Sequence, residues 1–75
     1  MNIILFAQMA ELLGAKELTI PNLTDTDNLI QYLKDKYEGF GNSAYIIAVG
    51  KEVIQENTKL YSNSIIALLP PYSGG

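Results

Sequence analysis

The sequence lacks the side chains that most often carry catalysis and metal binding. Its 75 residues include no cysteine and no histidine, and its five basic residues are all lysines. Without cysteine, neither a disulfide framework nor a thiolate metal site can supplement a small core. Without histidine, the commonest general base and metal ligand are both missing. Any chemistry must therefore use carboxylates, lysines, hydroxyls, the chain terminus or another protein's residues, and we expect no metal site and no hydrolase of familiar type.

Positive charge and long apolar runs are also scarce. Eight acidic residues against five lysines give a formal net charge of −3, which argues against a basic nucleic-acid-binding face. The longest apolar runs are about five residues, against the roughly twenty needed to cross a bilayer, and no basic-then-apolar leader opens the sequence. We therefore expect one small soluble domain in the cytoplasm, with neither nucleic acid nor membrane as a partner.

The end of the sequence is its most specific feature. Gly74-Gly75 follows an apolar segment and the double proline Pro70-Pro71. Two glycines leave the terminal carboxylate without neighbouring side chains, so it can enter a narrow channel and be activated as an acyl group. The prolines cannot continue a sheet ladder and favour an extended geometry. We predict a folded domain over residues 1–69 and an extended arm over residues 70–75.

The rest of the pattern predicts an α+β fold. Strands are expected over residues 2–7, 16–20, 44–49, 53–54 and 65–69, with a short helical turn over 8–13 that Gly14 closes. Residues 50–52 are expected to form the turn of a hairpin. The main helix is expected to begin with a capping box made by Thr24 and Asp27 and to end at Gly39 and Gly41.

Side-chain periodicity predicts which residues form the core. One helical face combines Leu29, Ile30, Leu33 and Tyr37. Leu60 and Tyr61 interrupt a polar segment, and both side chains are expected to be buried against the core.

One helix covers only one face of a sheet, yet the first and last strands are apolar at consecutive positions. We expect a first set of side chains to face the helix: Ile3, Leu5, Ile66 and Leu68. A second set would face the other way: Ile4, Phe6, Ile65, Ala67 and Leu69. An exposed apolar face of this size indicates a protein partner, unless loops or a longer helix cover part of it.

A resemblance to a known family rests on two segments. The first is the ending Leu68-Leu69-Pro70-Pro71-Tyr72-Ser73-Gly74-Gly75, which is similar to an apolar-apolar-Pro-Pro-x-Ser/Thr-Gly-Gly terminus. The second is Leu5-Phe6-Ala7-Gln8-Met9-Ala10-Glu11-Leu12-Leu13-Gly14, which resembles a first strand and the helical turn after it. Both are found in the ubiquitin-like sulfur-carrier subunit of molybdopterin synthase. The resemblance covers nearly the whole chain and implies a β-grasp fold, a mixed sheet of four or five strands with one main covering helix.

The resemblance also implies a carrier chemistry in which Gly75 is the reactive residue and Gly74 its spacer. In that family an ATP-dependent, E1-like enzyme adenylates the terminal glycine, and sulfur is installed as a thiocarboxylate. The terminus then enters the large synthase subunit and donates sulfur to a cyclic pyranopterin precursor, in molybdenum cofactor biosynthesis. Adenylation supplies the good leaving group that a carboxylate lacks. ATP is used by the activating enzyme, and no cofactor is expected on this chain.

The same resemblance implies contacts with the large subunit, in a heterotetramer. Phe6, Val53 and Leu69 match apolar positions that meet the larger partner. The arm adds Pro70, Pro71, Tyr72 and Ser73. No side chain of this protein is expected to be catalytic, so it would be the sulfur-donating subunit of a heteromeric sulfurtransferase, not an enzyme by itself.

Three other functions share parts of this pattern. A sulfur carrier for thiazole synthesis also ends in Gly-Gly, and a protein modifier would join Gly75 to lysine amines through the same acyl-adenylate. A β-grasp binding module with an inert tail would need no terminal chemistry. The sequence leaves all three open.

Overall fold

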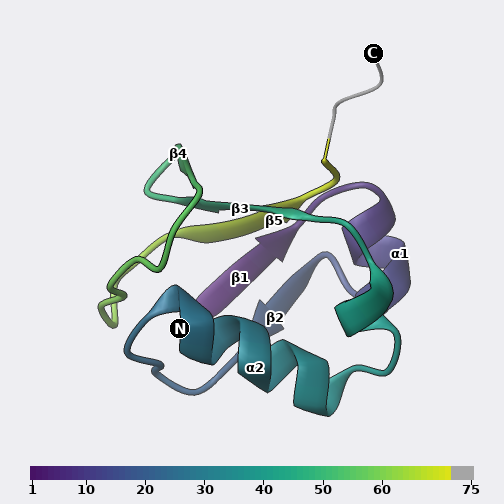
Figure 1. The fold of residues 1–75 in the computed structure, drawn as a ribbon, viewed down its shortest axis with the longest axis horizontal. Coiled ribbons are helices and arrows are strands. Elements are labelled where there is room, and N and C mark those ends of the chain that lie inside the picture. The colour runs from purple at the N-terminus through teal and green to yellow at the C-terminus, as the bar shows by residue number, and fades with distance from the viewer. Residues whose placement is uncertain (72–75) are drawn as a thin grey trace.

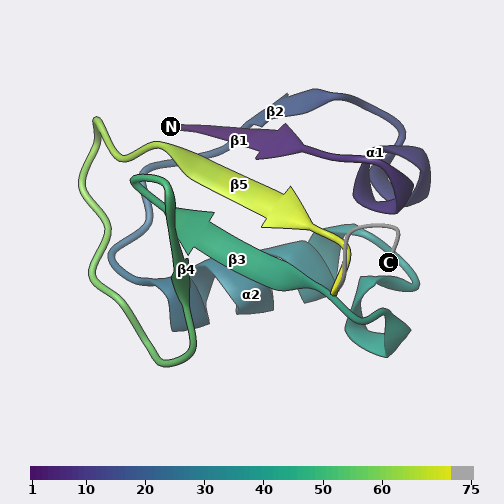
Figure 2. The same cartoon turned by 90° about the horizontal axis from the view of Figure 1, so that it is seen from above.

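The computed structural model describes residues 1–71. Within this range, five strands form one sheet in the order β2-β1-β5-β3-β4 (Figures 1 and 2). The strands are β1 (Asn2–Leu5), β2 (Glu17–Thr19), β3 (Ile46–Val49), β4 (Glu52–Ile54) and β5 (Ile66–Leu69). The helices are α1 (Gln8–Leu13), α2 (Thr26–Lys36) and the 3-10 turn η1 (Phe40–Asn42). The central strands β1 and β5 are parallel, and the other neighbouring pairs are antiparallel. The predicted mixed sheet with one main helix is confirmed.

The first strand, β1, is shorter than predicted. The strand was expected to reach Ala7, but it ends at Leu5, because Ala7 has φ 48° and turns the chain into α1. Phe6 still donates its N–H to the carbonyl of Leu68 at 3.1 Å, so it stays beside β5. Gly14 closes α1 as expected, in a left-handed conformation with its N–H bonded to the carbonyl of Ala10, a geometry that favours glycine.

The main helix begins one residue later than its capping box predicts. Asp25, not Thr24, is the N-cap, and its side chain accepts a hydrogen bond from the Asn28 N–H at 2.9 Å. Both residue types can cap a helix. A bridge to Lys59 pairs Asp25 with an extended segment, and this holds Asp25 in an extended conformation outside the helix. The helix then ends at Lys36, before either predicted glycine.

The core lies between α2 and the inner face of the sheet. Leu29 and Leu33 of α2 are fully buried there. Leu60 is buried as predicted, but the same prediction for Tyr61 is wrong, because its side chain is 59% exposed. The Asp25–Lys59 bridge makes this segment locally extended, and consecutive side chains of an extended chain point to opposite sides. Leu60 and Tyr61 therefore cannot both enter the core.

The β3–β4 hairpin is tighter than predicted. Val49 pairs with Glu52, so Glu52 belongs to β4 and only Gly50 and Lys51 form the turn. Their φ angles of 59° and 72° are both positive, which is the pattern of a two-residue type I′ turn. This turn places β4 at the edge of the sheet, beside β3 (Figure 2).

Candidate partner-binding face

The sheet has one buried and one exposed face, as the sequence predicts. Ile3, Leu5, Ile66 and Leu68 are buried beneath α2. Strand register places alternate residues on the opposite side: Ile4 pairs with Ala67, Ala67 with Ala48, and Ala48 with Val53. This is one continuous row across four strands.

A second row runs beside the first, closer to the end of β5. Leu69 pairs with Ile46, and the N–H bond to Leu68 holds Phe6 on the other side of Leu69. We call the two rows the outer face. It comprises Ile4, Phe6, Ile46, Ala48, Val53, Ala67 and Leu69. Phe6, Val53 and Leu69, which sequence resemblance singled out, therefore lie on one surface.

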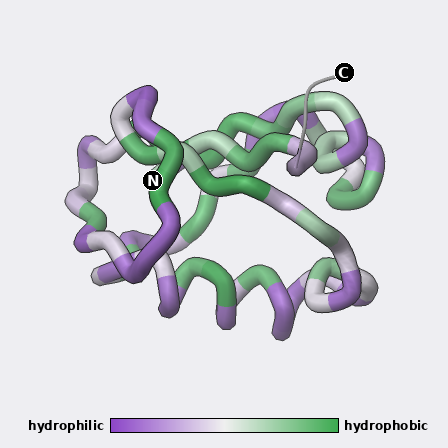
Figure 3. Tube along the Cα trace, turned by 45° about the horizontal axis from the view of Figure 1, so that its top comes forward, coloured by the Kyte–Doolittle hydropathy of each residue, from purple (hydrophilic) through white to green (hydrophobic). Residues whose placement is uncertain are grey.

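The outer face is open in the described part of the chain. Phe6 is 46% and Val53 59% exposed, and Leu69 is half-buried. The only long helix of residues 1–71, α2, lies on the other side of the sheet (Figure 1). Figure 3 shows hydrophobic residues along the central strands, whereas the turns of α2 that point away from the sheet are hydrophilic. The structure of residues 1–71 therefore contradicts the alternative that loops cover this face.

The outer face has a polar boundary at β2. In β2 the residues that pair with β1 on this side are Glu17 and Thr19, next to Ile4 and Asn2. Asn2 donates a hydrogen bond of 2.8 Å to the Glu17 carboxylate. The apolar surface therefore runs from β1 through β5 and β3 to β4, and it stops at β2.

The predicted reactive arm begins at one corner of this face. The strand β5 ends at Leu69, and Pro70 and Pro71 follow it outside the sheet. Pro70 is half-buried and Pro71 is exposed. Tyr72, Ser73, Gly74 and Gly75 lie outside the described residues, so their predicted roles and the extended arm remain predictions.

Sequence reasoning missed Ile46 and Ala48. The strand around them was predicted, but its residues were not assigned to faces. The signal was present, because Ile46-Ile47-Ala48-Val49 is apolar at four consecutive positions, as expected of a strand with two apolar faces. Register with β5 shows which two point outward.

The described residues offer no metal site and no membrane helix. Residues 1–71 contain no group of three acidic, histidine or cysteine side chains that could hold a metal ion. Over the same range no helix is long and apolar enough to cross a bilayer. The pKa of Lys36 is raised because its ammonium donates a hydrogen bond to the Tyr32 hydroxyl, and both residues lie on α2, away from the outer face.

The strand order, the parallel central pair and the single covering helix define a β-grasp domain, as the sequence resemblance implied. The chain matches the ThiS family over residues 3–75, and it belongs to that family.

Three similar proteins extend this assignment. The molybdopterin synthase sulfur carrier subunit of Dictyostelium discoideum is 35% identical over 81 aligned residues, which cover 99% of this chain and 94% of that protein. The solved structure of a complex of subunits 1 and 2 of molybdopterin-converting factor from Helicobacter pylori 26695 contains a chain with 27% identity and a TM-score of 0.74. That match covers 99% of this chain and 96% of the other. A putative molybdopterin-converting factor subunit 1 from Pyrococcus furiosus has 20% identity and a TM-score of 0.79, with 95% of both chains covered, and it supports the fold. These matches confirm the resemblance found in the sequence.

Proposed function

We propose that this protein is the sulfur-carrier subunit of a molybdopterin synthase. The observation that carries the proposal is the 35% identity, over nearly the full length of both chains, to a sulfur carrier subunit of that enzyme. The outer face supports it, because a carrier must dock on the proteins that load and unload it. The terminal Gly-Gly supports it as well, since it leaves an acyl group without side-chain obstruction.

The proposed chemistry takes place at the carboxylate of Gly75. In the loading step, a carboxylate oxygen attacks the α-phosphate of ATP on an E1-like activating enzyme, and pyrophosphate leaves. A sulfur nucleophile then displaces AMP from the acyl-adenylate and leaves a thiocarboxylate. In the unloading step, the thiocarboxylate sulfur bonds to a cyclic pyranopterin precursor. Water then cleaves the bond between the acyl carbon and sulfur, so that the sulfur stays on the precursor and the carboxylate is regenerated. This chain supplies the acyl group and its position, which makes the transfer effectively intramolecular within the complex.

The outer face is the proposed docking surface for the large subunit. It holds Phe6, Val53 and Leu69, and it leads to Pro70 at the end of β5. At about 25 cal/mol per Å² of apolar area removed from water, covering these side chains would contribute several kcal/mol to association. The Helicobacter pylori structure, a complex of subunits 1 and 2, supports a two-subunit assembly. We propose a heterotetramer with two copies of each subunit.

Removal of Gly75 tests the carrier role. The shortened chain should still bind the large subunit, because the outer face is intact, but it should form no molybdopterin from the precursor. Glu38→Gln, a change at an exposed residue just after α2 and outside the outer face, serves as a control that should keep full activity. Unchanged molybdopterin formation after removal of Gly75 would contradict the proposal and favour a binding module with an inert tail.

The intact mass of the protein from cells separates the remaining alternatives. A sulfur carrier should show an oxygen-to-sulfur exchange at its terminus. A protein modifier should instead appear as conjugates with lysines of other proteins. A carrier for thiazole synthesis would show the sulfur exchange but would fail to support molybdopterin formation with the large subunit.

A further inference from the structure

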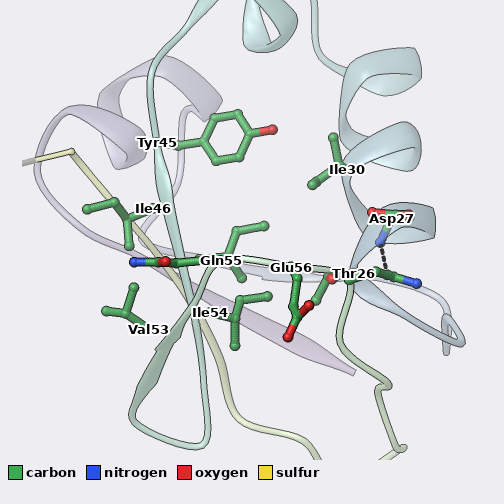
Figure 4. A pocket seen from close by; sticks show the side chains of 11 residues that line it. Thr26, Asp27, Ile30, Tyr45, Ile46, Val53, Ile54, Gln55 and Glu56 are labelled. Carbon is green, nitrogen blue, oxygen red and sulfur yellow. Dashed lines mark hydrogen bonds between the residues drawn. The ribbon is translucent and has the colours of Figure 1, made fainter.

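A groove of about 390 Å³ lies between the first turns of α2 and the β3–β4 hairpin. Apolar side chains line it from both sides, with Ile30 on α2 and Tyr45, Ile47 and Ile54 on or beside the two strands. Figure 4 shows Ile30 and Tyr45 projecting toward each other across the opening. The volume lies within the 300–1,000 Å³ range that is typical of ligand clefts.

The groove is acidic as well as apolar. Asp27 on α2 and Glu56 after β4 both line it, and none of the chain's five lysines does (Figure 4). Asp27 and Glu56 are both exposed. An occupant that brings an apolar surface alone would leave two carboxylates unpaired beside it, whereas an occupant with a positive charge would match them.

The groove is also continuous with the outer face. Ile46 and Val53 line it, and both belong to the outer face through their pairing with Leu69 and Ala48. The strand β4 is the edge of the sheet and is only three residues long. A partner that covers the outer face therefore needs to pass only this short edge to reach the groove.

We propose that the groove is a second docking site, which receives a segment of the large subunit that carries a lysine or arginine beside an apolar side chain. The apolar side chain would pack on Ile30 and Ile54, and the cation would lie between Asp27 and Glu56. The inference rests on the proposed function, since that function names the partner. It adds a charged contact on the helix side of the sheet to the apolar contact on the outer face.

The affinity of this protein for the large subunit of the same organism tests the proposal, by calorimetry at two salt concentrations. Glu56→Lys should weaken binding about tenfold or more at low salt, because a like charge would face the partner's cation. Glu56→Gln should weaken it less and should reduce its dependence on salt. Glu38→Lys makes the same charge change at an exposed residue outside the groove, and its affinity should stay within about twofold of that of the unmodified protein. Thermal unfolding of each variant verifies that the fold is intact.

Two further results separate this inference from the proposed function. If Phe6→Asp abolishes binding while Glu56→Lys and Glu38→Lys bind equally well, the groove proposal is wrong and the carrier function stands. If the unmodified protein does not bind the large subunit at all, both proposals fail. A tenfold loss for Glu56→Lys alone, removed by high salt, supports the groove as the site of a cationic segment.

Discussion

Asn57 accepts, at its side-chain oxygen, a hydrogen bond of 2.9 Å from the backbone N–H of Asp27, which lies thirty residues earlier in the chain. The same oxygen accepts a bond of 3.2 Å from the hydroxyl of Thr26, and the Asn57 amide donates to the Asp25 carboxylate at 3.3 Å. The free N–H groups at the start of a helix need acceptors. The helix α2 therefore receives part of its N-terminal capping from the segment between β4 and β5.

This relationship makes Asn57 a stability determinant despite its exposed side chain. We expect Asn57→Ala to lower the free energy of unfolding by about 1–2 kcal/mol, the usual effect of losing a helix cap. Denaturant unfolding followed by circular dichroism measures it. Asn63→Ala, at another exposed loop asparagine, should change stability by less than about 0.5 kcal/mol. Equal effects of the two changes would contradict the capping role.

Substitutions on the two faces of the sheet should have opposite effects: one on the outer face should weaken binding of the large subunit, and one on the buried face should lower stability. Phe6 lies on the outer face, so Phe6→Asp should abolish binding of the large subunit. It should change the free energy of unfolding by less than about 1 kcal/mol. Leu68→Ala removes a fully buried side chain and should cost about 2–5 kcal/mol of stability. Calorimetric binding and denaturant unfolding of both variants check the contrast. A strongly unfolded Phe6→Asp would show that Phe6 has a structural role instead.

The turn at Gly50 and Lys51 stores strain at one residue. Lys51 has φ 72°, a conformation that costs a side-chain-bearing residue about 1 kcal/mol or more. We expect Lys51→Gly to raise the midpoint of thermal unfolding, and Lys51→Val to lower it, because a β-branched residue tolerates positive φ least. Lys16→Gly, at an exposed lysine with ordinary φ, is the control and should not stabilise the protein.

Lys36 should titrate above its ordinary pKa. Its ammonium donates a hydrogen bond of 3.1 Å to the Tyr32 hydroxyl, and this contact raises the pKa of Lys36. The stabilising effect is complete below the unfolded-state pKa of 10.5 and is lost as the pH rises through the folded-state value. In Tyr32→Phe the pKa of Lys36 should fall, as measured by NMR titration of the lysine side chains. An unchanged pKa of Lys36 in this variant would contradict the role of the hydrogen bond.

The local pattern of apolar residues was sufficient to predict most of the helices and strands and the two faces of the sheet. Consecutive apolar residues in the first and last strands predict a sheet with two apolar faces, and one helix can bury only one of them. The structure confirms this at Ile3 and Leu68 on the inside and at Ile4 and Phe6 on the outside.

Two of the errors fall where a distant segment overrides a local preference. Thr24 and Asp25 are both competent caps, and the pairing of Asp25 with Lys59 selects the second. The same bridge explains why Leu60 enters the core and Tyr61 does not. The capping role of Asn57 could not be predicted from its own surroundings in the sequence, because its partners lie about thirty residues away.

The sequence by itself determined the α+β class, the buried face and the Gly-Gly terminus, because apolar periodicity and glycine act locally along the chain; the β-grasp fold was implied by the family resemblance. Only the tertiary structure decided that Ile46 and Val53 lie on the same surface as Phe6 and Leu69, since strand register aligns residues from separate strands. It also created the acidic groove beside that surface, by bringing Asp27 and Glu56 to the lining of one opening. Proximity of this kind depends on how elements pack, and no local pattern encodes it.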